Sequence, residues 1–495
     1  MRIRFSLTIV FLVLALPMTS LAHVNSPDVY YDGYAGPYHL LVTVRPPSVV
    51  PGVAQIQIRN AGDDVDEIQV LPLRMVGEAA KLAPAADVAE RSPTDPQSYS
   101  GKLWIMERGS WKVQVHVDGK KGKGELAVPL PAVSTKSTTM QAPLGSLLAV
   151  LGLVLVAGLV GIIGAASREA SLEPGQQPAS AQRILSYVGM GVATLVLIGV
   201  VLFGNWWWGL EASANARHNY LLPQVQPVLG AGNVLQLQLE NPNDMNVREP
   251  ETAKRLRQLG VVVPDAVRLD DLVPDHGHLL HLFLVRMPDM KSFWHLHPEQ
   301  TGVGQFADKL PALPSGHYQI YADIVHETGF PETQVGTIDL PGGTGEPLAG
   351  DDSGVADLAA TDKVAQLSGG YRMIWKRDQQ PLVAGQPVWF RFRVEGPDGK
   401  AASLENYMGM AGHAAFISDD GKIFAHVHPA GSVSMAAVDI AGNQKEDMQG
   451  MNGAPMNGEV SFPYGFPQPG DYHIFVQVKR GGHIETGAFA AHVVK

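Results

Sequence analysis

The sequence predicts a mainly β fold: three immunoglobulin-like β-sandwich modules plus two transmembrane helices. Most of the chain consists of short alternating runs broken by Pro, Gly and Asp, a pattern typical of sandwich strands. Two long uncharged apolar runs interrupt this pattern. Only 17% of the 495 residues are charged, against a usual ~25%, which also favours membrane segments or large sheets. A chain of this length favours about three domains.

The composition excludes several classes of function. No cysteine is present, which excludes a disulfide scaffold, a thiolate zinc finger, an iron–sulfur site and a cysteine nucleophile. The net charge of −11 argues against nucleic acid as a partner, because nucleic acid favours clustered Lys and Arg. The chain has no nucleophile elbow, phosphate loop or paired-carboxylate motif, and we expect that it is not an enzyme.

The N-terminus has the features of a secretory signal peptide over residues 1–22. Two arginines precede an apolar run over residues 5–16, and the tripeptide Ser20-Leu21-Ala22 provides a cleavage site. The apolar run is too short to cross the hydrocarbon of a bilayer comfortably, so cleavage is favoured over anchoring. Cleavage there leaves His23 as the first mature residue.

Two further apolar runs, residues 143–166 and 184–204, are predicted transmembrane helices. Each is uncharged over about twenty residues, enough to span a lipid membrane. A buried helical hairpin is the alternative interpretation. Arg168 and Arg183 lie in the short loop 167–183, which favours a cytoplasmic loop. Together with an exported first domain, this predicts an inner (plasma) membrane protein with its large domains on the periplasmic side.

The remaining chain divides into exported modules that repeat one another. The expected modules are residues 23–135, 213–342 and 363–495, with a Gly- and Asp-rich linker over residues 343–362. One short helix is expected over residues 250–259, which begin with Pro and precede Gly.

The repeat is strongest around a His-x-His-Pro element. Residues 293–298 match residues 424–429, and residues 316–321 match residues 470–475. A weaker third copy lies at residues 109–116. Such a repeat indicates a shared fold, and the paired histidines within it suggest a shared site.

In the third module the histidines fit a metal-binding hairpin. Asp420-Gly421 is a strong hairpin signal, and a turn centred there places His413 opposite His428, with His426 on the same face. Three imidazoles at that spacing can converge on one ion. The alternative is that these histidines bind backbone at strand ends and hold nothing.

The second module permits a similar geometry. A turn between Met287 and Pro288 pairs His278 with His297. His295 then joins them on that face, and His276 lies one step further out. In this register His281 falls on the opposite face, which predicts a structural role for it.

Methionines near these histidines favour copper over zinc. Met408 and Met410 precede His413, and Met435 follows His428. Three more methionines lie in a Gly/Asn-rich stretch: Met448, Met451 and Met456. Thioethers favour Cu(I), whereas three histidines with an open position suit Zn(II) or Cu(II). The alternative is that Met408 or Met435 fills gaps in the core.

A further copper site is possible at the mature N-terminus. His23 would supply an α-amine and an imidazole, and His116 or His39 a third nitrogen. The alternative is that His23 is first by chance, because signal cleavage leaves many residue types at that position.

Three motifs of the first module resemble those of YtkA-like and FixH-like secreted β-sandwich domains. They are the opening strand 38–44, the Pro- and Gly-rich turn over residues 46–52, and Gly109-Ser110-Trp111 before a late strand. The resemblance implies an immunoglobulin-like sandwich, export, and a link to copper delivery or oxidase assembly. The terminal histidine is similar to that of the copper-resistance-type periplasmic metal-binding modules, and the stretch 407–413 resembles modules often found beside copper-export genes.

We therefore expect a membrane-anchored, exported copper-binding protein for copper homeostasis, resistance or delivery. Its expected partners are the lipid membrane, copper ions, and a copper transporter or oxidase assembly component. A β-sandwich scaffold that docks a membrane protein complex without metal is the main alternative. A zinc hydrolase is a third, for which Glu299, Asp419 and Glu485 are candidate general bases without distinctive spacing.

Overall fold

The computed structural model describes residues 28–495 except 63, 138–139, 174, 217–218, 245–249, 259–267, 378–379 and 443–456. The predicted signal peptide and His23 lie outside the described residues. The same holds for Met448, Met451 and Met456. The expectations for these residues stay predictions.

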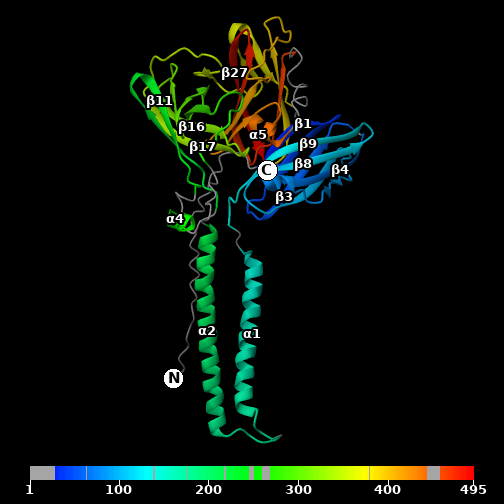
Figure 1. Cartoon of the computed structure of the whole chain (residues 1–495), viewed down its shortest axis with the longest axis vertical. Coiled ribbons are helices and arrows are strands. Elements are labelled where there is room, and N and C mark those ends of the chain that lie inside the picture. Colours follow the sequence, from blue (N-terminus) through cyan, green and yellow to red (C-terminus); the bar gives the residue numbers. More distant parts are fainter. Residues whose placement is uncertain are drawn as a thin grey trace, which may run out of the picture.

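The described chain is mainly β, as predicted, with three two-layered sandwiches gathered at one end of two long helices (Figure 1). Each sandwich pairs one sheet of four strands with one of five. Each sandwich encloses a core of alternating apolar side chains, which explains the alternation in the sequence.

The first sandwich has sheets ordered β1-β2-β3-β7-β6 and β5-β4-β8-β9. Its strands are β1 (Val29–Ala35), β2 (Tyr38–Arg45), β3 (Gly52–Asn60), β4 (Val65–Arg74), β5 (Asp87–Val88), β6 (Glu90–Arg91), β7 (Ser98–Ile105), β8 (Gly109–Gly119) and β9 (Gly122–Ala132). A 3-10 turn, η1 (Glu78–Lys81), follows β4.

The second sandwich has sheets ordered β10-β11-β15-β14 and β17-β16-β12-β13-β18. Its strands are β10 (Val225–Leu229), β11 (Val234–Leu239), β12 (His281–Met287), β13 (Phe293–Leu296), β14 (Glu299–Gly302), β15 (Gln305–Lys309), β16 (Gly316–Val325), β17 (Pro331–Leu340) and β18 (Ser353–Val355). It also contains η2 (Ala231–Asn233) and α4 (Pro250–Gln258), the expected short helix.

The third sandwich has sheets ordered β19-β20-β22-β25 and β21-β27-β26-β23-β24. Its strands are β19 (Val364–Gln366), β20 (Arg372–Trp375), β21 (Leu382–Val383), β22 (Val388–Glu395), β23 (His413–Ser418), β24 (Phe424–Val427), β25 (Glu459–Tyr464), β26 (Gly470–Arg480) and β27 (His483–Val494). It also contains η3 (Ser368–Gly370) and α5 (Met435–Ala441).

The linker expected over residues 343–362 is in part a component of the fold. Strand β18 within it pairs with the edge strand β13, from His295↔Ser353 to Phe293↔Val355. Gly354 permits this pairing, because a Cβ there would lie 1.8 Å from the Trp294 ring. The Gly and Asp content that predicted a free linker therefore reflects a close approach of backbone to a large side chain.

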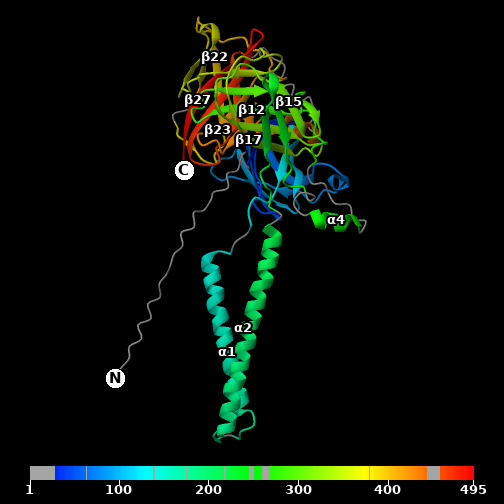
Figure 2. The same ribbon diagram turned by 90° about the vertical axis from the view of Figure 1, so that its left-hand side faces the viewer.

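The two apolar runs form α1 (Ala142–Glu169) and α2 (Ser180–Ala216), which lie side by side in both views (Figure 1, Figure 2). Both are long and apolar enough to cross a membrane, with mean hydropathies of 2.8 and 2.3. Their side chains are largely exposed, so a helix pair buried in the protein is not what the structure contains. The helices extend beyond the predicted 143–166 and 184–204 at both ends.

The second and third sandwiches meet through equivalent faces of their five-stranded sheets. Strand order β17-β16-β12-β13 in one corresponds to β27-β26-β23-β24 in the other. Two aromatic stacks cross the interface, Phe293 on Phe475 at 4.3 Å and Tyr321 on Phe424 at 4.2 Å. The sequence repeat makes these two pairs equivalent to each other, so the interface has approximate twofold symmetry.

The first sandwich packs against the third through β1. The Asp32 backbone amide donates to the Ala430 carbonyl at 2.7 Å, and the Ser432 backbone amide donates to the Tyr30 carbonyl at 2.9 Å. Gly431 lies between them with φ +123°, and a Cβ there would lie 2.0 Å from the Tyr30 carbonyl oxygen. This contact places the loop after the second His-x-His-Pro element directly against the first sandwich.

Candidate metal centre

The hairpin of the third sandwich has the predicted register. Ala414 pairs with Val427 and Ala415 with His426, the alignment expected for a turn centred on Asp420-Gly421. The loop is longer than predicted, because the Gly421 amide donates to the Ser418 carbonyl at 2.7 Å. Its centre is unchanged, and the histidine rings at 413, 426 and 428 therefore gather as expected.

The hairpin of the second sandwich is shifted by three residues from the prediction. Phe283 pairs with His295, and this register places His281 level with His297. The loop is centred on Asp289. The Met290 amide donates to the Arg286 carbonyl, and the Arg286 amide donates to the Ser292 carbonyl. The prediction that His281 points away from the other histidines was therefore wrong.

Eight imidazoles form one cluster at the interface between the two sandwiches. Rings of the cluster lie 3.9–6.2 Å from their neighbours, centroid to centroid. The members are His276, His278, His281, His295, His297, His413, His426 and His428. Five come from the second sandwich and three from the third. We call this set the histidine cluster.

Ring positions in the two sandwiches correspond closely. Centroids of the trio His281, His295 and His297 are separated by 5.3, 5.0 and 4.7 Å. The equivalent separations in the trio His413, His426 and His428 are 5.5, 5.1 and 4.4 Å. The repeat has therefore placed the same arrangement of rings on both sides of the interface.

One trio, His281, His295 and His297, has nitrogens within 4.8 Å of one another. Each ring also has an outward partner that accepts a hydrogen bond. His281 Nε2 lies 3.0 Å from the Asp275 carbonyl, His295 Nδ1 3.0 Å from Gln477 Oε1, and His297 Nδ1 2.9 Å from Asp352 Oδ1. These acceptors fix the N–H positions when each ring is neutral.

The other nitrogen of each ring in that trio then carries a lone pair that points inward. His281 Nδ1 and His295 Nε2 lie only 3.1 Å apart, and His297 Nε2 is buried without a hydrogen-bond partner among the described residues. Neutral rings with these outward bonds have no proton to share between the inward nitrogens. A bound cation would satisfy all three, with outward acceptors of the kind found around metal-ligating histidines.

A second set of nitrogens within 4.8 Å spans the interface: His276 from the second sandwich with His413 and His428 from the third. The His428 Nδ1–H donates to the Val433 carbonyl at 3.0 Å, which leaves Nε2 facing the set. Both ring nitrogens of His413, a residue only 1% exposed, lack partners in the described chain. Such unpaired buried groups are costly unless something binds them.

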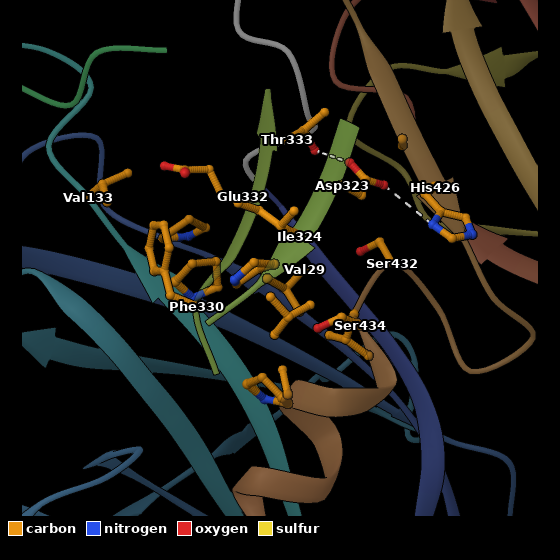
Figure 3. A pocket seen from close by; sticks show the side chains of 18 of the residues that line it. Val29, Val133, Asp323, Ile324, Phe330, Glu332, Thr333, His426, Ser432 and Ser434 are labelled. Carbon is orange, nitrogen blue, oxygen red and sulfur yellow. Dashed lines mark hydrogen bonds and ion pairs between the residues drawn. The ribbon is translucent and has the colours of Figure 1, made fainter. Parts of the chain in front are cut away.

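His426 is oriented by a carboxylate on the partner sheet. Thr333 donates to Asp323, whose other oxygen lies 3.4 Å from His426 Nδ1 (Figure 3). Burial raises the pKa of Asp323 to about 7. Gln477 occupies the equivalent strand position and contacts His295, so the two sandwiches orient their central histidines in the same way.

Burial and mutual repulsion lower the pKa of six imidazoles of the cluster. Burial, with a smaller contribution from neighbouring imidazoles, lowers the pKa of His281, His297 and His428 to about 3. The same causes hold the pKa of His295 and His413 well below the ordinary value, as they do for His426. Neutral imidazole is the form that binds metal, so the site is prepared for a cation.

Two identical turns deliver residues to the cluster, and sequence reasoning missed their relation. Asp275 and His278 exchange backbone hydrogen bonds, and so do Tyr407 and Met410. His276 (φ +51°) and Met408 (φ +50°) occupy the same left-handed position, each followed by glycine. Aligning residues 275–281 with residues 407–413 would have shown that His281 corresponds to His413.

The three predicted methionine ligands lie close to the interface. Met408, Met410 and Met435 line a cavity of about 320 Å³ together with His276. Met410 and Met435 also belong to the apolar core that the third sandwich shares with the first. A packing role and a role at the cavity are therefore both present for these two residues.

The two described histidines of the first sandwich, His39 and His116, do not join the cluster. His39 on β2 hydrogen-bonds to Asp32 at 2.5 Å, and this bond raises its pKa. His116 on β8, in the other sheet, pairs with Glu125 at 3.3 Å. The predicted site that joins them to His23 lies partly outside the described residues.

The predicted general bases are engaged elsewhere or exposed. Asp419 pairs with His473 at 3.1 Å, and Glu485 accepts hydrogen bonds from Ser368. Glu299 is exposed on the edge strand β14. These partners give no support to the zinc hydrolase alternative.

A second cavity, of about 330 Å³, lies between all three sandwiches and reaches the cluster from another side. His278, His281, His426 and His428 line one part of it. Its other walls combine apolar, hydroxyl and charged side chains, with Val29, Phe330, Glu332 and Ser432 in view in Figure 3.

Comparison with known proteins identifies one part of the chain. A family model described as a domain of unknown function (DUF8832) matches residues 365–495, which form the third sandwich. No curated protein matches the sequence. The resemblance of the first sandwich to YtkA-like and FixH-like domains stays a prediction.

Several solved structures show remote likeness. An engineered protein is 12% identical over 19% of this chain and 20% of its own, with a TM-score of 0.15. A tetra-tandem repeat from the extending region of a large adhesion protein is 7% identical over 90% of this chain and 71% of its own, also with a TM-score of 0.15. Salmonella alpha-2-macroglobulin reacted with methylamine is 8% identical over 97% of this chain and 24% of its own, with a TM-score of 0.19. The chain thus spans about a fifth of the first and a quarter of the last, and scores this low support no argument. What the comparisons establish is a DUF8832 match confined to the third sandwich.

Proposed function

We propose that this protein is a membrane-anchored, exported copper-binding protein that holds its ions on the histidine cluster. One observation carries the proposal: the outward hydrogen bonds of His281, His295 and His297 leave three buried lone pairs facing one another. A cation is the simplest species that satisfies them. The cross-interface set of His276, His413 and His428 supports a second ion.

Copper is favoured over zinc by the neighbouring thioethers. Imidazole suits both metals, whereas thioether sulfur favours Cu(I). Met408, Met410 and Met435 line a cavity with His276, a member of the cross-interface set. The chain contains no cysteine that could serve as a thiolate ligand for zinc.

Storage or delivery is favoured over catalysis. Two carboxylates next to the buried rings, Asp352 and Asp323, face histidine Nδ1 atoms, an orienting rather than a proton-transferring position. We propose a role in copper homeostasis, resistance or delivery, with a copper transporter or an oxidase assembly component as partner.

The two apolar helices and the charges between them support a proposed location. We propose that α1 and α2 cross the plasma membrane, with the ten residues between them in the cytoplasm and the sandwiches outside. Arg168 and Arg183 beside this loop support that orientation. A reporter that fluoresces only in the cytoplasm should be active in the loop and inactive at the C-terminus. The reverse pattern would contradict the orientation.

Metal analysis of the full-length protein in detergent tests the proposal. We expect the wild-type chain to retain copper after reconstitution and dialysis against a weak chelator. His297→Ala/His428→Ala should lose copper from both sets. His317→Ala/His492→Ala is the matched control, because these two histidines are exposed and pair with aspartates outside the cluster. Wild-type protein that binds no metal would overturn the proposal and favour the scaffold alternative.

A further inference from the structure

A half-open cavity, lined by methionines, borders the histidine cluster. Its floor is buried, with Met408 9%, Met410 6% and Met435 5% exposed. Its rim is exposed at Gly277, Gly409 and other residues. The full lining is Pro274, Asp275, His276, Gly277, Met408, Gly409, Met410, Met435, Ala436 and Asp439.

Three separate elements build this cavity. The turn around His276 comes from the second sandwich, and the equivalent turn around Met408 comes from the third. Helix α5 contributes Met435, and its Ala436 amide donates to Asp275 Oδ1 at 2.9 Å, which fastens the helix to the first turn. The cavity is therefore fixed in place by contacts across the interface between the two sandwiches.

His276 belongs both to the cavity and to the cross-interface metal set. It lines the cavity beside the three methionines, and its ring lies 5.2 Å from that of His413 and 5.0 Å from that of His428. His276 Nε2 is buried and has no hydrogen-bond partner in the described part of the chain. It is the one described member of the histidine cluster in this lining.

Most imidazoles of the cluster are closed to solvent, so an ion reaches them through one of the two cavities that border the cluster. His413 is 1% exposed, His428 2% and His295 0%. An ion from outside has to pass the half-buried residues first. Thioethers on the floor of the cavity, beside His276, would select a soft monovalent ion and hold it weakly, as transfer to imidazoles requires.

We propose that this cavity is the port through which Cu(I) enters the histidine cluster. Met408, Met410 and Met435 serve as transient thioether ligands, and His276 is the first imidazole that receives the ion. The ion stays Cu(I) throughout, so no electron is transferred. The inference rests on the proposed copper-binding function and adds to it the oxidation state and the direction of entry.

A purely structural role for the methionines makes a different prediction. Met410 and Met435 pack in the core shared with the first sandwich, and leucine would fill that space nearly as well. Leucine cannot ligate Cu(I). Substitution by leucine therefore separates packing from transport.

The test compares loading rates in the full-length protein. Cu(I) is supplied without oxygen as a coloured complex with a weak chelator, and loading is followed by loss of the colour in a stopped-flow instrument. We expect M408L/M410L/M435L to load Cu(I) about tenfold more slowly than wild type, equivalent to about 1.4 kcal/mol of barrier. Zn(II), which does not use thioethers, should load at the wild-type rate.

Two further variants separate the effect of the cavity from a general effect on the fold. Met373→Leu alters a methionine buried in the third sandwich and outside this lining, and it should load at the wild-type rate. Ala436→Leu narrows the cavity and leaves every sulfur in place, so it should slow Cu(I) even if the triple variant is unstable.

The result separates this inference from the proposed function. Wild-type protein that binds no copper at equilibrium removes both. If M408L/M410L/M435L and Ala436→Leu bind copper normally and load Cu(I) at the wild-type rate, the port is disproved and the proposed function stands. Entry is then assigned to the cavity between the three sandwiches. Equal slowing of Cu(I) and Zn(II) in the triple variant would also overturn the role of the sulfurs.

Discussion

His413 is the clearest case of a residue kept at the expense of stability. It is almost fully buried, and both ring nitrogens lack partners among the described residues. An unsatisfied buried polar group costs about 1–3 kcal/mol. Leucine has a similar volume and no polar atoms. The proposed metal binding therefore explains the native histidine better than packing does.

His413→Leu should accordingly stabilise the metal-free protein, by about 1 kcal/mol or more. The same variant should lose part of the rise in melting temperature that copper gives to the wild type, because a ligand that binds only the folded state stabilises it. Denaturant and thermal unfolding with and without copper measure both effects. A large loss of stability in the metal-free variant would mean that His413 serves the fold.

Acid should unfold the metal-free protein. The pKa values of His281, His297 and His428 are lowered to about 3 by burial, against about 6.5 in an unfolded chain. The unfolded state therefore binds more protons between pH 6.5 and 3. The stability that these histidines contribute is present above pH 6.5 and falls with acid, by roughly 1.4 kcal/mol per pH unit for each.

Urea unfolding of the metal-free protein at pH 7, 6 and 5 checks this slope. His297→Ala/His428→Ala should show a shallower decline, because two of the shifted groups are gone. An equal slope in the variant and the wild type would assign the acid sensitivity to other groups.

At the scale of elements, the accuracy of the predictions depended on the turn signals. Asp420-Gly421 marks the centre of the β23–β24 loop, and the register followed from it. The β12–β13 loop has no such dipeptide, and the choice of Met287 and Pro288 as its centre moved the register by three residues. The prediction therefore left His281 out of the metal-binding trio and placed His278 opposite His297 instead.

That shift leads to a direct comparison of two histidines. His281→Leu should reduce copper affinity more than the ~10–100-fold typical of losing a residue that supports a ligand. His278→Leu should have a smaller effect, because His278 stacks on His297 from the rim at 3.9 Å and is 31% exposed. Competition with a chelator of known affinity measures both. A larger effect at His278 would contradict the register of the structure.

The sequence predicted the sandwiches and helices better than the contacts between them. Local alternation and apolar length determine each element, and both are visible along the chain. The cross-interface set joins His276 to His413, residues that are distant in sequence and meet only because two sheets pack face to face. No local pattern encodes such a meeting, although the repeat made a symmetrical contact conceivable.

For the whole molecule, one glycine permits a close backbone contact between the first and third sandwiches. A Cβ at Gly431 would collide with the Tyr30 carbonyl, so Gly431→Ala should separate the first sandwich from the third. We expect a larger radius in small-angle scattering and faster proteolysis, with copper binding retained. Gly399→Ala is the matched control, because Gly399 also has a positive φ (+74°) but no atom within 4 Å of an added Cβ. Unchanged scattering in Gly431→Ala would contradict this contact.

The paired aromatic stacks, Phe293 with Phe475 and Tyr321 with Phe424, have a consequence for how such a chain can arise. Each sandwich presents a surface that complements a near copy of itself, which is the defining property of an isologous contact. A single ancestral unit with this surface would have formed homodimers, with imidazoles from both subunits meeting at the axis. Gene duplication and fusion would then have allowed the third sandwich to replace histidines by methionines at positions 408 and 410. The second sandwich would have kept the equivalent histidines, His276 and His278.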